Sequence, residues 1–285
     1  MKLVTFRRSS SAAPEAGLLE GSIVFPLQDM GYVDAESLIA AGPQAWEAAK
    51  EPAGRTGQVP LASVELLAPM LRPPRIFCVG LNYQDHATES KMAVQAVPTI
   101  FMKLPSAITG PESEIVLPAN STQPDYEAEL AVVIGKPATH VTRENWRECV
   151  FGYTILNDVS ARDVQLATSQ WTLGKSFPTF CPIGPWIVTA DELTDPHNLD
   201  VRLTIDGVTM QQANTRDFVF DVPAVLGYIS AVVPLVPGDI VSTGTPQGVG
   251  LGRTPQRWLR PGEEVAIEIS GIGKLVNRTV AARVS

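Results

Sequence analysis

Residues 125–135, DYEAELAVVIG, place two glutamates inside a run that otherwise has the pattern of a buried β-strand. Because side chains along a strand point alternately to its two faces, Glu127 and Glu129 point the same way. Two carboxylates at this spacing would repel each other and lose solvation unless a cation lay between them. The segment therefore predicts a divalent metal site. Surface salt bridges on an exposed strand face are the alternative.

A third carboxylate ends the apolar run FGYTILND, residues 151–158. Asp158 could face the same pocket as Glu127 and Glu129. Three carboxylates from two strands would form an all-oxygen site that suits Mg²⁺ or Mn²⁺. Zinc fits less well, because no histidine or cysteine lies nearby in the sequence. A metal of this kind suggests an enzyme.

The composition narrows the class of protein. With 285 residues, 45% hydrophobic and 18% charged, the chain can form one large domain or two unequal ones and fits a soluble protein. Its net charge of −8 argues against a nucleic-acid surface. Cys78, Cys149 and Cys181 form no CxxC pair and are expected to be reduced core thiols. No segment has the pattern of a signal peptide or a membrane span, so we expect a cytoplasmic protein.

Turn residues separate short strand-like runs over most of the chain, which predicts a mixed, β-rich fold. The expected strands are residues 2–6, 22–26, 75–80, 99–103, 129–135, 151–159, 185–190, 200–207, 238–244 and 264–270. The expected helical segments are residues 34–50, broken at Gly42-Pro43, 142–150, with Thr142 as a candidate N-cap, and 221–233.

The frequent prolines and glycines, 24 and 22, suit a roll or barrel with long loops better than a doubly wound sheet. A Gly/Pro-containing stretch at residues 51–60 loosens the chain, and Pro73-Pro74 follows it. We therefore expect a small N-terminal α/β domain, residues 1–68, and a main domain, residues 69–285.

The segment NYQDHATE, residues 82–89, carries a candidate acid–base pair. His86 and Glu89 are three residues apart, so in a helical turn their side chains can form a hydrogen bond. Such a bond holds the imidazole in one tautomer and prepares it to take a proton from water. A pair on a helix surface is the alternative.

Two further segments carry candidate substrate contacts. Lys175 follows a glycine and precedes a Pro/Phe-rich loop, so its ammonium could enter a pocket, although a lone lysine is more often solvated. Arg162 and Gln165 could donate to a carboxylate or a carbonyl. The glycine-rich loop 242–252 has neither the dinucleotide nor the P-loop spacing. It is expected to bring Thr245 and backbone N–H groups to a small anion.

Taken in order, these segments resemble the fumarylacetoacetate hydrolase family, especially the branch of fumarylacetoacetate hydrolase domain-containing proteins. The resemblance covers about residues 65–280 and includes GLNYQDHATE, PTIFMKLPSAITGP, DYEAELAVVIGK, GYTILNDVSARDVQ, GKSFPTFCPIGPWIVT, QQANTRDFVF and PGDIVSTGTPQGVG. It implies a catalytic domain built as a mixed β-roll or β-sandwich behind a small N-terminal domain, and a homodimer. Pro178 departs from the family pattern, in which many members have an acidic residue, and this leaves the substrate assignment open.

The resemblance also implies roles for particular residues. Glu127, Glu129 and Asp158 would hold Mg²⁺ or Mn²⁺. His86 and Glu89 would form the catalytic dyad, with Lys175 near the oxo group of the substrate. The residues that it assigns to substrate binding are Tyr83, Arg162, Gln165 and Thr245.

The activity expected first is hydrolysis of a C–C bond in a 2,4-dioxo acid of the acylpyruvate or fumarylpyruvate type, as in aromatic catabolism. His86 and Glu89 would activate the water, and the metal with Lys175 would stabilise the departing pyruvate enolate. The alternatives are an oxaloacetate decarboxylase or tautomerase and a 2-hydroxymuconate-type isomerase, which need an enolate but no placed water. A non-catalytic metal-binding relative is a remote alternative. The expected partner is a small 2-oxo acid, with no nucleic acid and no membrane.

Overall fold

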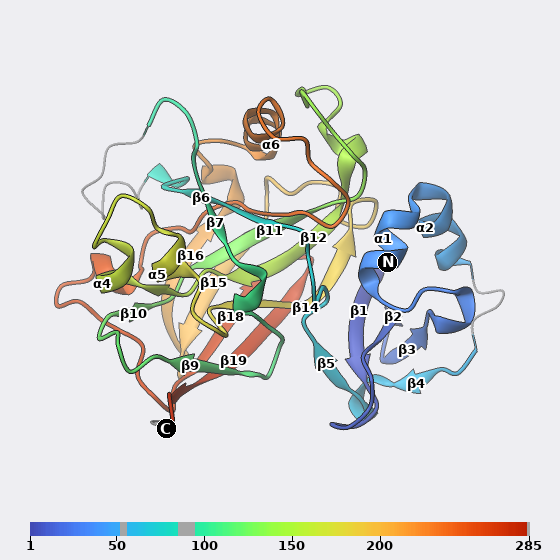
Figure 1. Cartoon of the computed structure of the whole chain (residues 1–285), viewed down its shortest axis with the longest axis horizontal. Helices are drawn as coiled ribbons and strands as arrows, with labels where there is room; N and C mark the ends of the chain where they lie inside the picture. Colours follow the sequence, from blue (N-terminus) through green and yellow to red (C-terminus); the bar gives the residue numbers. More distant parts are fainter. Residues whose placement is uncertain (52–55, 85–94, 284–285) are drawn as a thin grey trace.

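The computed structural model describes residues 1–51, 56–84 and 95–283, and most of its strands lie in two sheets (Figure 1). In this part of the chain the larger sheet has the order β4 (Val59–Pro60), β3 (Ile23–Pro26), β2 (Glu15–Glu20), β1 (Lys2–Arg7), β14 (Cys181–Thr189), β12 (Val150–Asn157), β11 (Ala128–Ile134), β17 (Ile240–Ser242), β6 (Ile76–Gly80) and β7 (Thr99–Lys103). Two short strands, β5 (Glu65–Leu67) and β8 (Ile108–Thr109), pair with β1 and β14.

The second sheet has the order β16 (Val208–Asn214), β15 (Asp200–Ile205), β18 (Glu264–Ile269), β19 (Gly273–Ala281) and β9 (Glu114–Leu117). A separate short ladder joins β10 (Pro124–Asp125) to β13 (Ser160–Ala161). The α-helices described are α1 (Ala35–Ala41), α2 (Pro43–Lys50), α4 (Arg162–Gln165), α5 (Thr172–Lys175) and α6 (Val222–Ser230). The 3-10 turns are Gln28–Met30, Leu61–Ser63, Pro105–Ala107, Trp146–Cys149, Thr215–Asp217 and Gly250–Gly252.

Strand β11 is buried on both faces, and its side chains point alternately into two hydrophobic clusters. Leu130 and Val132 pack in a cluster with apolar residues of α6, β15 and β18. Ala131 and Val133 pack on the opposite side in a cluster that includes residues of β1 and α1. A strand covered on both sides leaves little solvent for a polar side chain at its end, so the glutamates at its start must find partners within the protein.

The N-terminal strands continue the larger sheet. Strand β1 pairs antiparallel with β14, with Lys2 opposite Val188. Figure 1 shows β1 to β4 together with α1 and α2 along one side of the molecule. Trp46 of α2 packs edge-on against Phe151 of β12, with ring centroids 5.0 Å apart. The division into residues 1–68 and 69–285 stays a prediction.

The structure confirms the expected β-rich, mixed fold and most of the expected strands. The helix expected at residues 142–150 is wrong, because the segment forms only a 3-10 turn at Trp146–Cys149. Thr142 Oγ1 accepts the N–H of Glu144 at 3.3 Å and the Asn145 side chain accepts the N–H of Thr142 at 2.8 Å, as at the start of a helix. No α-helix follows, because β12 begins directly after the 3-10 turn. The helix at residues 221–233 is confirmed in a shorter form, with Asp221 as its N-cap.

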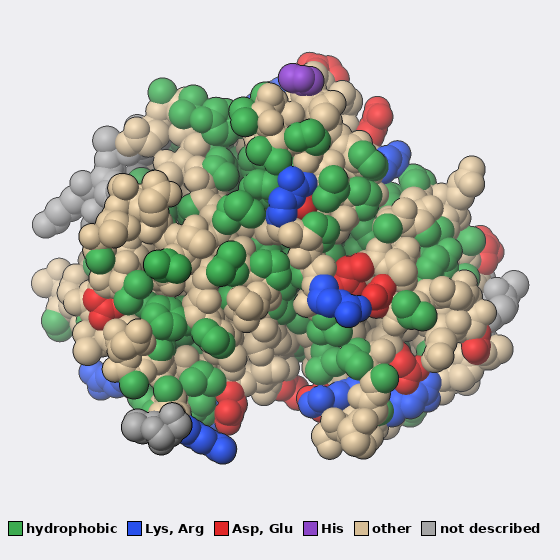
Figure 2. Space-filling view, viewed as in Figure 1, with side chains coloured by type: hydrophobic (Ala, Val, Ile, Leu, Met, Phe, Trp, Pro, Cys, Tyr) green, Lys and Arg blue, Asp and Glu red, His purple; other side chains and the backbone are tan. Residues whose placement is uncertain are grey.

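On the face drawn in Figure 2, acidic and basic side chains lie in small groups between hydrophobic ones, and the described side chains form no extended basic patch there. Within the described ranges, the structure has no helix that is both long and apolar enough to cross a membrane.

Candidate metal and substrate site

The three predicted carboxylates meet where β11 begins and β12 ends. Glu127 directly precedes β11, Glu129 lies in it, and Asp158 directly follows β12. The two strands pair antiparallel with Ala128 opposite Asn157, which brings these ends side by side. One ligand atom from each residue lies within 4.8 Å of the others, and no other such acidic, histidine or cysteine group occurs in the described ranges. Glu127 and Glu129 are 4% and 2% exposed, so the alternative of an exposed strand face is wrong.

Glu129 shows that the cluster fits a divalent cation. Its Oε2 accepts hydrogen bonds from Ser242 Oγ at 2.5 Å and from the N–H of Gly244 at 2.9 Å. Its Oε1 has no hydrogen bond to any residue that the structure describes. Burial, followed by the charges of Asp158 and Glu127, raises the pKa of Glu129 well above its ordinary value. A buried carboxylate oxygen that has no donor among the described residues, beside two further carboxylates, matches the ligands that Mg²⁺ and Mn²⁺ prefer.

Lys175 occupies the centre of the cluster. It is the last residue of α5 and is 2% exposed, so the alternative of a solvated lysine is wrong. Its Nζ donates to Glu127 Oε2 at 2.5 Å and to Asp158 Oδ2 at 2.7 Å. Burial lowers the pKa of this ammonium, but the charges of Asp158 and Glu127 outweigh burial and the net shift is upward. Lys175 is therefore a charged hydrogen-bond donor at neutral pH.

Lys103 is a second buried cation that the sequence reading missed. It ends β7 and has no exposed surface. Its Nζ donates to Asp158 Oδ1 at 2.6 Å, to the carbonyl of Val159 at 3.1 Å and to the carbonyl of Lys175. One ammonium thus fixes both Asp158 and the end of α5. The available signal was a lysine that closes the apolar run TIFMK.

Arg162 and Gln165 also reach the cluster, from the two ends of the short helix α4. The guanidinium of Arg162 donates to Asp125 at 2.8 Å, to Gln165 at 2.9 Å and to Glu127 Oε1 at 2.6 Å. Asp125, which the sequence reading also missed, accepts the N–H of Gly250 at 2.6 Å. Burial lowers the pKa of Arg162, but the charges of Glu127 and Asp125 raise it further than burial lowers it. In this structure Arg162 holds Glu127 in place.

A pocket opens onto the cluster. Its polar lining comprises Glu127, Glu129, Arg162, Gln165, Lys175 and Thr245. Its remaining lining comprises Val79, Gly80, Leu81, Phe101, Leu166, Trp171 and Leu251. The pocket therefore has a charged part and an apolar part, as small-molecule sites usually do.

Thr245 lies where the sequence predicted, at the pocket wall. It is 3% exposed, and its Oγ1 accepts a hydrogen bond from Gln211 Nε2 at 2.8 Å. The Oε1 of Gln211 in turn accepts the N–H of Ala128 at 2.9 Å, which links Thr245 to the start of β11. The role of Gln211 could not be predicted from the sequence, because its partners are distant along the chain.

Tyr83 and Pro178 lie outside this pocket. Tyr83 is buried against Phe218 and lines a separate hollow with Gln84, Asp217 and Gln247. Pro178 is exposed and does not line the pocket. The predicted dyad, His86 and Glu89, lies outside the described residues.

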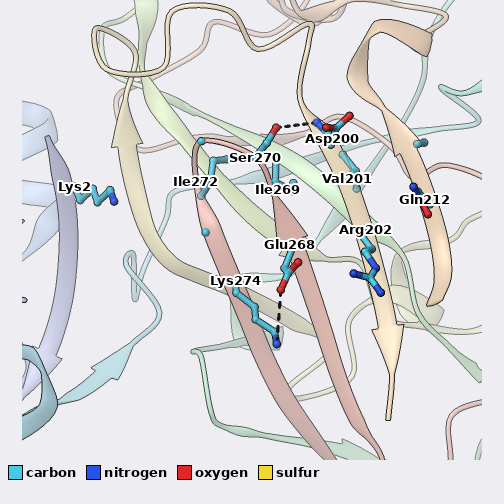
Figure 3. Close-up of a pocket in the computed structure, with 13 residues that line it drawn as sticks. Lys2, Asp200, Val201, Arg202, Gln212, Glu268, Ile269, Ser270, Ile272 and Lys274 are labelled. Carbon is cyan, nitrogen blue, oxygen red and sulfur yellow. Dashed lines mark hydrogen bonds and ion pairs between the residues drawn. The ribbon is translucent and has the colours of Figure 1, made fainter. Parts of the chain in front are cut away.

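A larger hollow lies between Lys2 of β1 and strands β15, β18 and β19 (Figure 3). Glu268 and Lys274 form an ion pair there at 3.7 Å, and both side chains are about half exposed. The Arg202 guanidinium donates to Thr209. These charges are exposed and form no group of metal ligands, so the acidic pocket remains the candidate site.

Comparison with known proteins gives a family match and a similar curated protein. Residues 75–280 match the model of the family described as fumarylacetoacetate (FAA) hydrolase, C-terminal. The chain is 40% identical over 288 residues to "Oxaloacetate tautomerase Fahd2a, mitochondrial" of Rattus norvegicus, an alignment that covers 98% of this chain and 92% of the relative.

Two solved structures have the same fold at high similarity. A 2-hydroxyhepta-2,4-diene-1,7-dioate isomerase from Mycobacterium marinum is 36% identical with a TM-score of 0.80, and the match covers 99% of this chain and 98% of that one. A maleylpyruvate hydrolase from Sphingobium sp. SYK-6, in complex with manganese (II) ion and pyruvate, is 34% identical with a TM-score of 0.82, covering 99% of this chain and 100% of that one.

Proposed function

Because the chain belongs to the fumarylacetoacetate hydrolase family, we propose that it is a metal-dependent enzyme that interconverts the keto and enol forms of a 2-oxo acid of the oxaloacetate type. The observation that carries the proposal is the buried group of Glu127, Glu129 and Asp158 around the ammonium of Lys175. The name of the rat relative supports this reaction. Hydrolysis, the activity that the sequence analysis expected first, also needs a positioned water. The residue expected to activate that water, His86, lies outside the described residues.

The reaction moves one proton. In the keto acid a C–H bond at C3 breaks, a double bond forms between C2 and C3, and the C2 oxygen takes up a proton. A divalent ion held by the three carboxylates would act as a Lewis acid and stabilise the negative charge that develops on that oxygen. Two of the three N–H bonds of Lys175 go to Glu127 and Asp158, which leaves the third to donate to the substrate oxygen.

The chain's own residues hold this site in advance of substrate. Each carboxylate is anchored through one oxygen by a different partner: Glu127 by Arg162, Asp158 by Lys103, and Glu129 by Ser242. The second oxygens of Glu127 and Asp158 accept the hydrogen bonds of Lys175, and the second oxygen of Glu129 has no hydrogen bond to a described residue. Such outer partners orient metal ligands and lower the cost of assembling the site. Thr245, whose hydroxyl accepts a hydrogen bond from Gln211, would meet the substrate carboxylate.

A spectroscopic assay of enol oxaloacetate tests the proposal. Chelator-treated protein should show no acceleration of keto–enol exchange, and added Mg²⁺ or Mn²⁺ should restore it. Glu129→Gln should lower the metal-dependent rate at least about 100-fold, because it removes a charged ligand. Glu268→Gln, on the exposed face of β18, is the matched control and should behave as wild type. Full activity after complete metal removal would contradict the proposal.

Hydrolysis of an acylpyruvate is the second candidate. The solved maleylpyruvate hydrolase favours it, and so does the presence of both His86 and Glu89 in the sequence. A panel of acylpyruvates, oxaloacetate and hydroxymuconate-type acids would separate hydrolysis, decarboxylation and isomerisation by their products. If the wild type cleaves acylpyruvates, His86→Ala should abolish cleavage with metal binding retained. Absence of cleavage across the panel would exclude this candidate.

A cytoplasmic location stays a prediction, and the name of the rat relative includes "mitochondrial".

A further inference from the structure

Two aromatic rings form a wall that extends from Lys175 into the apolar part of the pocket. The Lys175 Nζ lies 5.0 Å from the ring centroid of Phe101, a residue of β7. Trp171, which directly precedes α5, packs against Phe101 with ring centroids 5.3 Å apart and an interplanar angle of 65°. Both rings are partly exposed and both line the pocket. The indole is thus the next layer of the wall beyond Phe101.

Gly80 makes room for this indole. It ends β6 and pairs with Thr99 of β7. A Cβ atom at position 80 would lie 2.7 Å from Cζ3 and 3.2 Å from Cη2 of Trp171. These separations are shorter than ordinary van der Waals contacts between carbon atoms. Any other residue at position 80 would therefore displace the ring. The place of the indole therefore depends on a glycine that is distant in sequence.

The cations of the described pocket lining, Arg162 and Lys175, serve its charged part. Three of the five N–H groups of Arg162 go to Asp125, Glu127 and Gln165, and the other two have no partner among the described residues. They could donate to a second substrate carboxylate such as that of oxaloacetate. Lys175 has one N–H without a described partner, which the proposed function assigns to the substrate oxygen at C2. The rest of the described lining is apolar and offers Trp171 and the leucines Leu81, Leu166 and Leu251.

Resting on the proposed function, we infer that Trp171 is a specificity-determining residue and that its indole, placed by Gly80, binds a planar apolar substituent on C3 of the 2-oxo acid. Aromatic faces stack on planar groups and bury a large apolar area. The substrate class of this site then includes aryl- and alkenyl-substituted pyruvates as well as oxaloacetate. The charged part of the pocket is common to both kinds of substrate, and only the substituent distinguishes them.

Keto–enol exchange of phenylpyruvate and of oxaloacetate, measured with the metal-loaded full-length protein, tests the inference. Trp171→Ala should lower kcat/KM for phenylpyruvate about 10-fold or more, mainly through KM, and change that for oxaloacetate less than about 3-fold. Gly80→Ala should act in the same direction because it moves the ring. Trp171→Phe keeps a planar ring and should stay within about 3-fold of wild type on both substrates. Leu173→Ala, 74% exposed on the same helix and outside the pocket lining, is the control.

The outcomes distinguish the inference from the function on which it rests. If wild type acts on oxaloacetate and not on phenylpyruvate, or if Trp171→Ala lowers both activities equally while Leu173→Ala does not, the inference is wrong and the proposed function stands. If wild type acts on neither acid with any divalent ion, the proposed function fails and the inference fails with it.

Discussion

Ser242 is a neutral side chain that orients Glu129, a candidate metal ligand. Its hydroxyl donates to Glu129 Oε2 at 2.5 Å, and so fixes the carboxylate whose other oxygen has no described partner. We predict that Ser242→Ala lowers Mn²⁺ affinity about 10- to 100-fold, as removal of an outer partner of a metal ligand usually does. Calorimetric titration measures this directly. Ser230→Ala, which removes a buried hydroxyl in α6, is the control, and equal affinity in the two variants would contradict the assigned role.

Lys103 tests how far the buried charges depend on one another. Its ammonium has no exposed surface and donates to Asp158 and to two carbonyls. Lys103→Met should lower the free energy of unfolding by about 3–5 kcal/mol, because Asp158 would remain buried with one oxygen unpaired. Lys274→Met removes a half-exposed partner of Glu268 and should cost less than about 1 kcal/mol. Denaturant titration compares the two, and similar losses would show that Lys103 has no special role.

At the residue scale the sequence identified the three candidate ligands and missed their hydrogen-bond partners. Glu127, Glu129 and Asp158 stood out because carboxylates are unusual at the ends of apolar strands. Lys103 is 55 residues from Asp158, and Asp125 is 37 residues from Arg162. Spacing along the chain carries no information about such pairs, so only the folded structure shows them.

At the scale of elements, α4 and α5 bring Arg162 and Lys175 to the same site. Gly174 allows the two helices to approach closely. A Cβ at position 174 would lie 2.3 Å from the backbone N and 2.5 Å from the Cα of Gln165. Gly174→Ala should therefore separate the helices, displace Lys175 and lower kcat/KM at least about 10-fold. The expected loss of stability is about 1–3 kcal/mol.

The neighbouring substitution is the control for this prediction. Leu173→Ala changes an exposed side chain of the same helix and should alter stability by less than about 0.5 kcal/mol. Wild-type kinetics in Gly174→Ala would show that the helix contact does not position Lys175.

These two helices could not be predicted from the sequence pattern. Each has only four residues, Arg162–Gln165 and Thr172–Lys175, which is too short for a helical period to appear in the sequence. The longer α6 was predicted from its apolar run. The segment at residues 142–150 had a helical composition, but β12 begins at Val150 and leaves only the 3-10 turn Trp146–Cys149 before it.

At the scale of the whole molecule, the sheet order could not be read from the strand pattern. Strand β17 pairs in parallel with β6, and β19 pairs in parallel with β9, across more than half of the chain. Local alternation predicts that a strand exists, and it does not select a distant partner. The strand pattern and the proline and glycine content predicted the β-rich class, and the family resemblance supplied the architecture in more detail.

The homodimer stays a prediction at this scale. One chain has a mass of 30.6 kDa, so sedimentation equilibrium should report about twice that value at micromolar concentration. A mass that stays at one chain across the accessible concentration range would contradict it.

The central claim is that Glu127, Glu129 and Asp158 bind one divalent cation, and calorimetric titration of Mn²⁺ into chelator-treated protein tests it most directly. Wild type should bind one ion per chain, and at about 100 times Kd the ion should raise the free energy of unfolding by about 2.7 kcal/mol. Glu129→Gln should bind far more weakly and gain correspondingly little stability. Equal binding by the wild type and by a variant with all three carboxylates changed to amides would contradict the account.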